Sequence, residues 1–279
     1  MCAGILALVL KGSGDSKSLS SGFGKKIGLV KVEGAIYQSN SIVEQLRSFR
    51  QDKNISGVLL RVDSPGGGVA PSQEIYNEVM RYKSENKPLV VSMGNTAASG
   101  GYYISSPAQK IFAAPGTITG SIGVIMSLPM YKELGDKLGI QVRTLKAGEL
   151  KDMGSPYRGI TSKENHHFDL LLKDIHNQFI DDVARGRGMP RDSVAVLANG
   201  SVYTGNMALA NNLIDTLGGY EDALDYLRKI SGAGSQAKVV ERKKPSSALG
   251  EWLIEEIINI FPQTYTFLSS TGFHYLFSL

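Results

Sequence analysis

The chain has 279 residues, of which 42% are hydrophobic and 20% are charged, so it can bury a substantial core and is not predominantly disordered. Thirty lysines and arginines against 26 aspartates and glutamates give a net charge of +4 spread along the chain, and we expect no nucleic acid as a partner. One cysteine and four histidines exclude an internal disulfide and leave too few ligands for a zinc site, so we expect no metal and no cofactor.

Residues 1–25 are expected to lie outside the folded domain. Residues 2–10 form an apolar run, but a helix that spans a bilayer needs about 20 residues. Because the run also lacks the basic start of a signal peptide, it is the clipped end of a longer anchor, a short interfacial patch or a mispositioned start. Nine of the 13 residues from 12 to 24 are glycine or serine, which predicts a flexible tether.

Residues 26–235 alternate β-branched runs with amphipathic stretches, which predicts one α/β domain with mostly parallel strands. The expected strands cover residues 27–33, 58–62, 89–93, 110–114, 123–127 and 141–145. The expected helices lie around residues 42–49, 75–82 and 129–138, with a short helix opening at Ser99 and further short helices across 190–230. A long helix should begin at the capping box from Thr161 to Glu164 and end near Gly186.

Residues 236–279 are predicted to be a basic linker followed by an aromatic tail, because residues 252–279 contain seven of the chain's 22 aromatic side chains. An apolar surface this concentrated is expected to pack against another surface. The tail folds back onto its own domain, docks onto a neighbouring subunit or lies on a membrane surface, and the sequence leaves these three alternatives open.

Ser99 lies at a predicted turn between a buried strand and a short helix. The residues around it are small enough for a substrate backbone to approach, and the start of the helix offers unpaired amides beside the hydroxyl. These small residues are Ala97, Ala98, Gly100 and Gly101. Nucleophilic serines use such a strand-to-helix turn. The alternative is that Ser99 only caps the helix.

Three consecutive glycines, Gly66, Gly67 and Gly68, follow another predicted strand. Successive glycine amides can point into one concavity, which suits an oxyanion or a phosphate. A phosphate loop would continue into Gly-Lys-Ser or Gly-Lys-Thr, and this segment does not. The glycines therefore predict an oxyanion hole, and the alternative is an ordinary tight turn.

A serine hydroxyl needs a base to become a nucleophile, and histidine is the usual one. His166, His167 and His176 lie on the predicted long helix at spacings that do not converge, and His274 lies in the tail. A Ser-His-Asp triad is therefore not expected, and a lysine base is the other known solution.

Two lysines, Lys146 and Lys151, follow the expected strand at 141–145 in a glycine-containing loop. A lysine acts as a base only when neutral, so its pKa must fall from about 10.4 to about 7, which requires roughly 4 kcal/mol of desolvation. Asp152 must then point away from the base, because a close carboxylate would keep the amine protonated. The alternative is that both lysines are solvated surface charges.

Five short motifs follow one another along the chain: Asp63-Ser-Pro-Gly-Gly-Gly68, Ala97-Ala-Ser-Gly-Gly-Tyr-Tyr103, Thr119-Gly-Ser-Ile-Gly-Val124, Lys151-Asp-Met-Gly-Ser-Pro156 and Val202-Tyr-Thr-Gly205. Together they resemble the signal peptide peptidase SppA family, membrane-associated serine proteases with a Ser-Lys dyad. The resemblance implies Ser99 as the nucleophile and Lys151, rather than Lys146, as the general base. The implied oxyanion donors are the amides of Gly66 and Gly100, and the implied lysine-orienting residue is Ser121.

The resemblance also implies a fold. It is the ClpP/crotonase-like fold, in which repeated ββα units form the core and an α-helical region joins protomers. Because this chain carries each motif once, it resembles the short, single-unit form of the family. In that form the dyad lies within one protomer or is shared by two, and both arrangements stay open.

The function implied by the resemblance is that of a serine endopeptidase. It would cleave apolar peptide segments such as remnant signal peptides at or near the cell membrane, with the catalytic domain on the extracytoplasmic side. The implied partners are peptide substrates, further copies in a ring-shaped homo-oligomer, and the membrane. The alternative is a catalytically idle ring-forming scaffold or peptide-binding protein. A crotonase-type hydratase would need acidic catalysts, and the base loop offers only Glu149 and Asp152.

Overall fold

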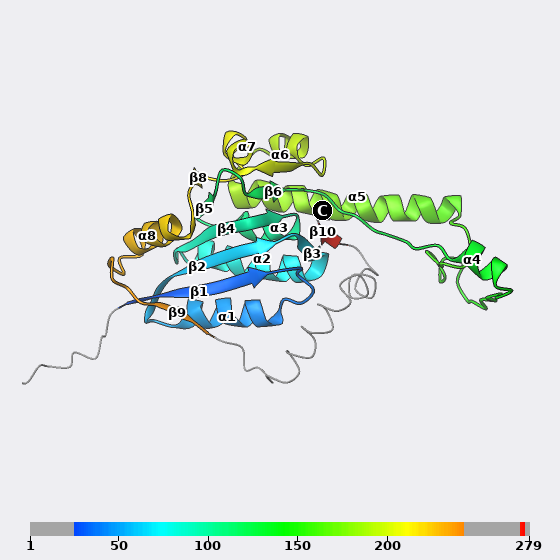
Figure 1. Ribbon diagram of the computed structural model, residues 1–279, viewed down its shortest axis with the longest axis horizontal. Coiled ribbons are helices and arrows are strands. Elements are labelled where there is room, and N and C mark those ends of the chain that lie inside the picture. Colours follow the sequence, from blue (N-terminus) through cyan, green and yellow to red (C-terminus); the bar gives the residue numbers. More distant parts are fainter. Residues whose placement is uncertain (1–24, 243–273, 277–279) are drawn as a thin grey trace, which may run out of the picture.

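The computed structural model describes residues 25–242 and 274–276 (Figure 1). The predictions for residues 1–24, and those for the aromatic tail apart from 274–276, lie outside the described residues. The strands are β1 (Lys26–Glu33), β2 (Ile55–Ser64), β3 (Gly66–Gly68), β4 (Leu89–Ala98), β5 (Lys110–Ala113), β6 (Ile118–Gly120), β7 (Val202–Thr204), β8 (Thr216–Leu217), β9 (Val239–Glu241) and β10 (His274–Leu276). The helices are α1 (Asn40–Gln51), α2 (Val69–Ser84), α3 (Gly100–Ser105), α4 (Lys132–Lys137), α5 (Ser162–Arg187), α6 (Arg191–Leu197), α7 (Gly205–Ala210) and α8 (Tyr220–Ile230).

The main sheet has the strand order β7-β6-β4-β2-β1-β9, and β5 and β8 extend it beside β4. Its neighbouring strands pair in parallel except for β6 and β7, which are antiparallel. Parallel strands need crossover connections, and helices supply several of them here. The predicted α/β architecture with mostly parallel strands is confirmed.

Helices cover both faces of this sheet. Because side chains alternate along a strand, Leu60 of β2 joins the core cluster that contains Phe49 of α1 and Ile75 of α2. Its neighbour Leu59 joins the opposite cluster, which contains Leu227 of α8. All five side chains are buried. Burial on both faces explains why the first halves of the central strands are predominantly apolar.

The carboxyl ends of β2 and β4 lie side by side. Ser64, the last residue of β2, is paired with Ala97 of β4. Beyond these ends, β2 leads through the glycine strand β3 into α2, and β4 leads into α3. This edge of an open parallel sheet is where α/β proteins bind their ligands.

Helix α5 begins and ends as predicted. The Thr161 side chain accepts a hydrogen bond from the Glu164 amide, and the Glu164 side chain accepts one from the Thr161 amide, which forms the capping box. Gly188 ends the helix in the left-handed conformation, with φ at 65°. Among the described residues, neither α5 nor any other helix has the length and apolarity needed to cross a bilayer.

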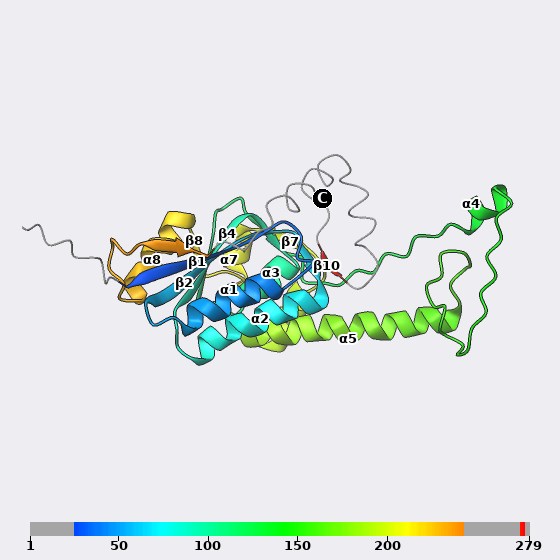
Figure 2. The same ribbon diagram turned by 90° about the horizontal axis from the view of Figure 1, so that it is seen from below.

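The first part of α5 projects away from the sheet together with residues 126–161 (Figure 2). We call this projection, residues 126–171, the arm. The buried part of α5 that packs on the core cluster lies further along, at Phe179, Ile180 and Val183. The arm therefore extends outward from a helix that is anchored at its other end.

The arm is where the predicted elements were wrong. No strand forms at 123–127 or 141–145, and the helix expected over 129–138 covers only α4. Val142 and Leu145 are 51% and 84% exposed, and no described strand lies beside them to complete a ladder. A β-branched run predicts a strand only where a partner strand is near.

The described part of the tail returns to its own domain. Strand β10 pairs antiparallel with β3, placing Leu276 opposite Gly66 and His274 opposite Gly68. Figure 1 shows β10 beside β3, although these two strands are far apart along the chain. Of the three alternatives for the tail, residues 274–276 follow the first.

We expect Gly205→Ala to destabilise the protein. A Cβ at Gly205 would lie 2.0 Å from the Ala114 carbonyl oxygen, so the backbone of one segment would have to shift. Overpacking of this kind costs roughly 1 to 3 kcal/mol, and the melting temperature should fall by roughly 2 to 12 °C. Gly116→Ala is the matched control, since a Cβ there meets nothing within 4 Å. Equal melting temperatures for the two variants would contradict the prediction.

Candidate active site

Ser99 occupies a strained turn between β4 and α3. Its φ and ψ are 51° and −117°, a conformation that side chains other than glycine rarely adopt. The Ser99 amide donates to the Gly120 carbonyl oxygen at 2.7 Å, which fixes the turn against β6. The residue is 1% exposed. This is the predicted strand-to-helix turn, and its strain matches that of known nucleophile turns.

Glycines let the two turns at this edge touch. A Cβ on Gly100 would lie 3.1 Å from both the Gly66 Cα and the Gly67 nitrogen. A Cβ on Gly101 would lie 2.7 Å from the Ser64 carbonyl oxygen. The start of α3 is therefore packed directly on the glycine strand, so that Gly66 and Gly100 lie together as expected of a shared site.

The hydrogen bonds of β3 show which segment of the chain lies at each of its two edges. The Gly68 amide donates to the Ile36 carbonyl oxygen at 2.8 Å, and the Ile36 amide donates to the Gly66 carbonyl oxygen at 2.8 Å. Because successive peptide groups alternate, Gly67 faces the opposite edge, where β10 lies. The Gly66 amide donates to Ser64 Oγ at 3.1 Å, so in this conformation it already has an acceptor within the chain.

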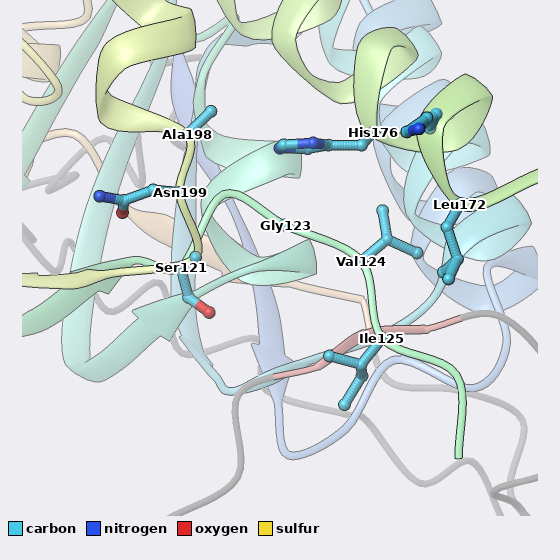
Figure 3. A pocket seen from close by; sticks show the side chains of 10 residues that line it. Ser121, Gly123, Val124, Ile125, Leu172, His176, Ala198 and Asn199 are labelled. Carbon is cyan, nitrogen blue, oxygen red and sulfur yellow. The ribbon is translucent and has the colours of Figure 1, made fainter. Parts of the chain in front are cut away.

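Ser121 lines a pocket of about 380 Å³ (Figure 3). It follows Gly120, the residue whose carbonyl accepts from Ser99, and its own amide donates to the Ser201 carbonyl oxygen at 2.8 Å. The other lining residues come from the segment after β6, from α5 and from the loop before β7: Gly123, Val124, Ile125, Leu172, Lys173, His176, Ala198, Asn199 and Gly200. The pocket therefore adjoins the Ser99 turn.

Lys151 does not meet Ser99 within one chain. It lies in the loop between α4 and α5, and its neighbour Asp152 is bonded through Arg158 to Glu164 in the first turn of α5. From Glu164 to Phe179 the helix advances roughly 22 Å.

At that inner end, the Phe179 ring packs on Tyr103 of α3, with ring centroids 4.7 Å apart. Helix α3 begins directly after Ser99. One chain thus brings together Ser99, Gly66, Gly100 and Ser121 at the sheet edge, and it holds Lys151 at the outer end of α5.

The lysines of the base loop differ in their partners. Lys146 forms an ion pair with Asp152, and Lys163 forms one with Glu149. Lys151 is exposed, and across residues 25–242 its amine makes no ion pair or hydrogen bond. Hydrogen bonds from Arg158, and then from Lys146, lower the pKa of the Asp152 carboxyl below its usual range. Asp152 therefore points to other cations, as a lysine base beside it would require.

Two features of this region were missed in the sequence. Arg158 bridges Asp152 and Glu164, but it is six residues from each and belongs to no pattern that marks a site. Strand β10 has no local signal of its pairing with β3 either. Among the described residues, no three His, Cys, Asp or Glu side chains are grouped so that they could hold a metal ion.

Comparison with known proteins identifies the family. Residues 81–233, more than half of the chain, match the model of peptidase family S49. The chain belongs to peptidase family S49. Residues 26–118 also match the Clp protease family model, which agrees with the observed sheet and confirms the predicted ClpP-like fold. The resemblance drawn from the five motifs is thereby confirmed, and with it the assignment to a family of serine-type peptidases.

Several S49 relatives match over most of this chain. It is 42% identical over 222 residues to an Enterococcus faecium protein provisionally named signal peptide peptidase SppA, covering 79% of this chain and 64% of that protein. It is 38% identical over 210 residues to a provisionally named protease of Synechocystis sp., covering 75% of each. It is 32% identical to the chloroplastic serine protease SPPA of Arabidopsis thaliana, covering 81% of this chain but 34% of the plant protein. The chain thus spans just under two thirds of the first relative.

Proposed function

We propose that this S49 member is a serine endopeptidase with a Ser-Lys dyad shared between two copies of the chain. Ser99 of one copy is the nucleophile and Lys151 of a second copy is the general base. The observation that carries the proposal is the placement of Ser99 on a strained turn beside glycine amides, while Lys151 stands unpaired on a projecting arm.

The arm supports assembly with a second copy. Apolar side chains gather on it without a cover from the described residues: Met130, Leu134, Leu138, Ile140, Val142 and Leu145. Exposed apolar surface of this extent marks an interface. Lys151 on the arm has no Ser99 beside it in its own chain. A second copy provides one, because the pocket beside Ser121 is open and adjoins the Ser99 turn. Repeated head-to-tail contacts of this kind close into a ring, which is the predicted homo-oligomer.

Acyl transfer follows from this arrangement. An amine docked in the pocket loses its water, which favours the neutral form. Neutral Lys151 takes the proton of the Ser99 hydroxyl as the oxygen attacks the peptide carbonyl, and Ser121 orients the amine. Amides of Gly100 and of the glycine strand stabilise the oxyanion. The lysine then gives its proton to the leaving amine, and water hydrolyses the ester by the same route.

The substrate we propose is an extended apolar peptide such as a remnant signal peptide. Strand β10 supports the mode of binding, because it adds to β3 as a peptide adds to an exposed sheet edge. Only small side chains flank Ser99, which leaves room for the peptide backbone. The expected setting is the extracytoplasmic side of the cell membrane, where such remnants arise.

A serine-reactive fluorophosphonate tests the proposal. We expect it to label Ser99 in the intact protein, because attack on phosphorus requires the activated hydroxyl. Labelling should disappear in Lys151→Ala and be retained, at most partly slowed, in Lys146→Ala, which changes the other lysine of the same loop. Peptide mass spectrometry identifies the labelled residue. Labelling at another serine would redirect the assignment, and peptide binding without any labelling would favour an idle scaffold.

A further inference from the structure

An ionic cluster on the arm surrounds the turn that carries Lys151. Arg158 lies at its centre: its Nε donates to Asp152 Oδ2 at 2.9 Å, and its Nη1 donates to Glu164 Oε2 at 2.9 Å. Its Nη2 donates to the Asp152 carbonyl oxygen at 3.1 Å. Lys146 places a second cation on Asp152. One planar guanidinium therefore ties both the side chain and the backbone of the residue after Lys151 to the start of α5.

Glu164 makes this attachment firm. Its side chain is 1% exposed, and its Oε2 accepts hydrogen bonds from the Thr161 amide at 2.8 Å and from Thr161 Oγ1 at 3.0 Å. A buried carboxylate needs a cation, and Arg158 is the one that pairs with it among the described residues. The Glu164 carboxylate in the first turn of α5, rather than the loop, thus fixes the position of the Arg158 side chain.

Apolar packing holds this loop only weakly. A Cβ on Gly154 would lie 3.2 Å from Leu128 and 3.4 Å from Phe168, so the turn touches these two side chains. Leu145, at the beginning of the loop, is 84% exposed. The position of Lys151 therefore depends mainly on the ionic cluster.

The cluster also decides which charges lie near the Lys151 amine. Asp152 is bonded to Arg158 and Lys146, and the remaining charged pair of the loop, Glu149 with Lys163, is satisfied internally. Hydrogen bonds from Arg158 and from Thr161 lower the pKa of the Glu164 carboxyl. Neither Asp152 nor Glu149, the two carboxylates of the loop that carries Lys151, is thus left to pair with Lys151.

The pocket that would receive the amine brings its own titratable groups. Lys173 and His176 of α5 line it, and no carboxylate is among the described residues that line it. The His176 Nε2 is buried and has no hydrogen-bond partner within the described part of the chain. A docked amine would therefore meet no fixed negative charge in the pocket, and Asp152 is the nearest carboxylate along the chain.

We propose that Arg158 is a positioning residue of the peptidase. It holds Asp152 against Glu164, so that Lys151 projects toward the active site of a second copy with no carboxylate beside its amine. The inference rests on the proposed role of Lys151 as the base. Without Arg158, Asp152 is free to pair with the Lys151 ammonium and to favour the charged form, which cannot act as a base.

The test is the pH profile of kcat/KM for an apolar peptide. In Arg158→Met we expect the acid-side midpoint to rise by about one pH unit, with kcat down about threefold at pH 7.5 and KM within about twofold. The double variant Arg158→Met/Asp152→Asn should return the midpoint to its original value, because the freed carboxylate is gone. In the protein that retains Arg158, the pKa values of Asp152 and Glu164 are lowered, so both carboxyls stay ionised above about pH 6 and do not contribute to its profile.

Arg191→Met is the matched control. Arg191 is also an arginine bound to α5, through Asp181 at 2.6 Å and Asn177 at 2.8 Å, but it lies away from the loop. Its profile should be unchanged. A loss of activity in Arg158→Met that is equal at every pH and not recovered in the double variant would show a purely structural role and overturn the inference.

Two further measurements keep the outcomes distinct. If sedimentation shows that Arg158→Met does not assemble, Lys146→Met replaces it, since it frees Asp152 in part and should raise the midpoint by a smaller amount. Absence of that rise overturns the inference.

Lys151→Ala tests the proposed function separately: if it retains activity, both proposals fail. If it is inactive while Arg158→Met keeps the original midpoint, only the role of Arg158 is wrong.

Discussion

Ser99→Ala and Lys151→Ala proteins, each inactive alone, are expected to regain activity when they are assembled together. Either loss removes an essential group of the dyad and should lower kcat/KM at least about 1,000-fold. If each site takes its serine from one copy and its lysine from another, random one-to-one mixing pairs intact groups at about a quarter of the sites. Steady-state cleavage of an apolar peptide by the mixed assembly measures this recovery.

The control for this experiment contains the same number of altered chains. Ser99→Ala mixed with the double variant Ser99→Ala/Lys151→Ala should stay inactive, because no chain then supplies a serine. Native mass spectrometry establishes that mixed assemblies have formed. A mixed assembly of the two single variants without activity would mean that the dyad lies within one chain, contrary to the placement of Lys151 on the arm.

Removal of residues 274–279 is expected to strengthen peptide binding. Strand β10 occupies the edge of β3 to which we expect an extended peptide substrate to add, so the two compete. If β10 is paired about nine tenths of the time, KM falls about tenfold on its removal while kcat is unchanged. Measurement of kcat and KM on the full and shortened chains decides between competition and no effect.

Tyr275→Pro is a gentler form of the same change. Tyr275 is paired with Gly67, and proline has no amide hydrogen to donate to a ladder. The variant should reproduce part of the fall in KM with all residues present. A KM that stays constant or rises in both proteins would show that β10 does not compete with substrate.

The central strands and the site turns could be predicted because neighbouring residues encode them. Residues 58–62 and 89–93 are apolar, partly β-branched runs that lead toward glycine turns, and they lie within β2 and β4. The capping box that begins at Thr161 depends on only four consecutive residues. Where the determinant of structure is this local, a single sequence is informative.

The arm and its contacts depend instead on residues far apart. Residues 141–145 have the pattern of a strand, but no partner strand lies beside them in the described part of the chain. Arg158 can bridge Asp152 and Glu164 only because the fold brings these two residues together at the start of α5. The separation of Ser99 from Lys151 likewise follows from the length of that helix, which no motif expresses.

The distance spanned by α5 has a consequence for the cell that makes this protein. Under the proposed dyad, a newly synthesised molecule contains an alcohol at one end and an amine at the other, and neither can act alone. Such a molecule does not cleave surrounding proteins until it meets others of its kind. Hydrolysis then depends steeply on abundance, because assembly follows mass action.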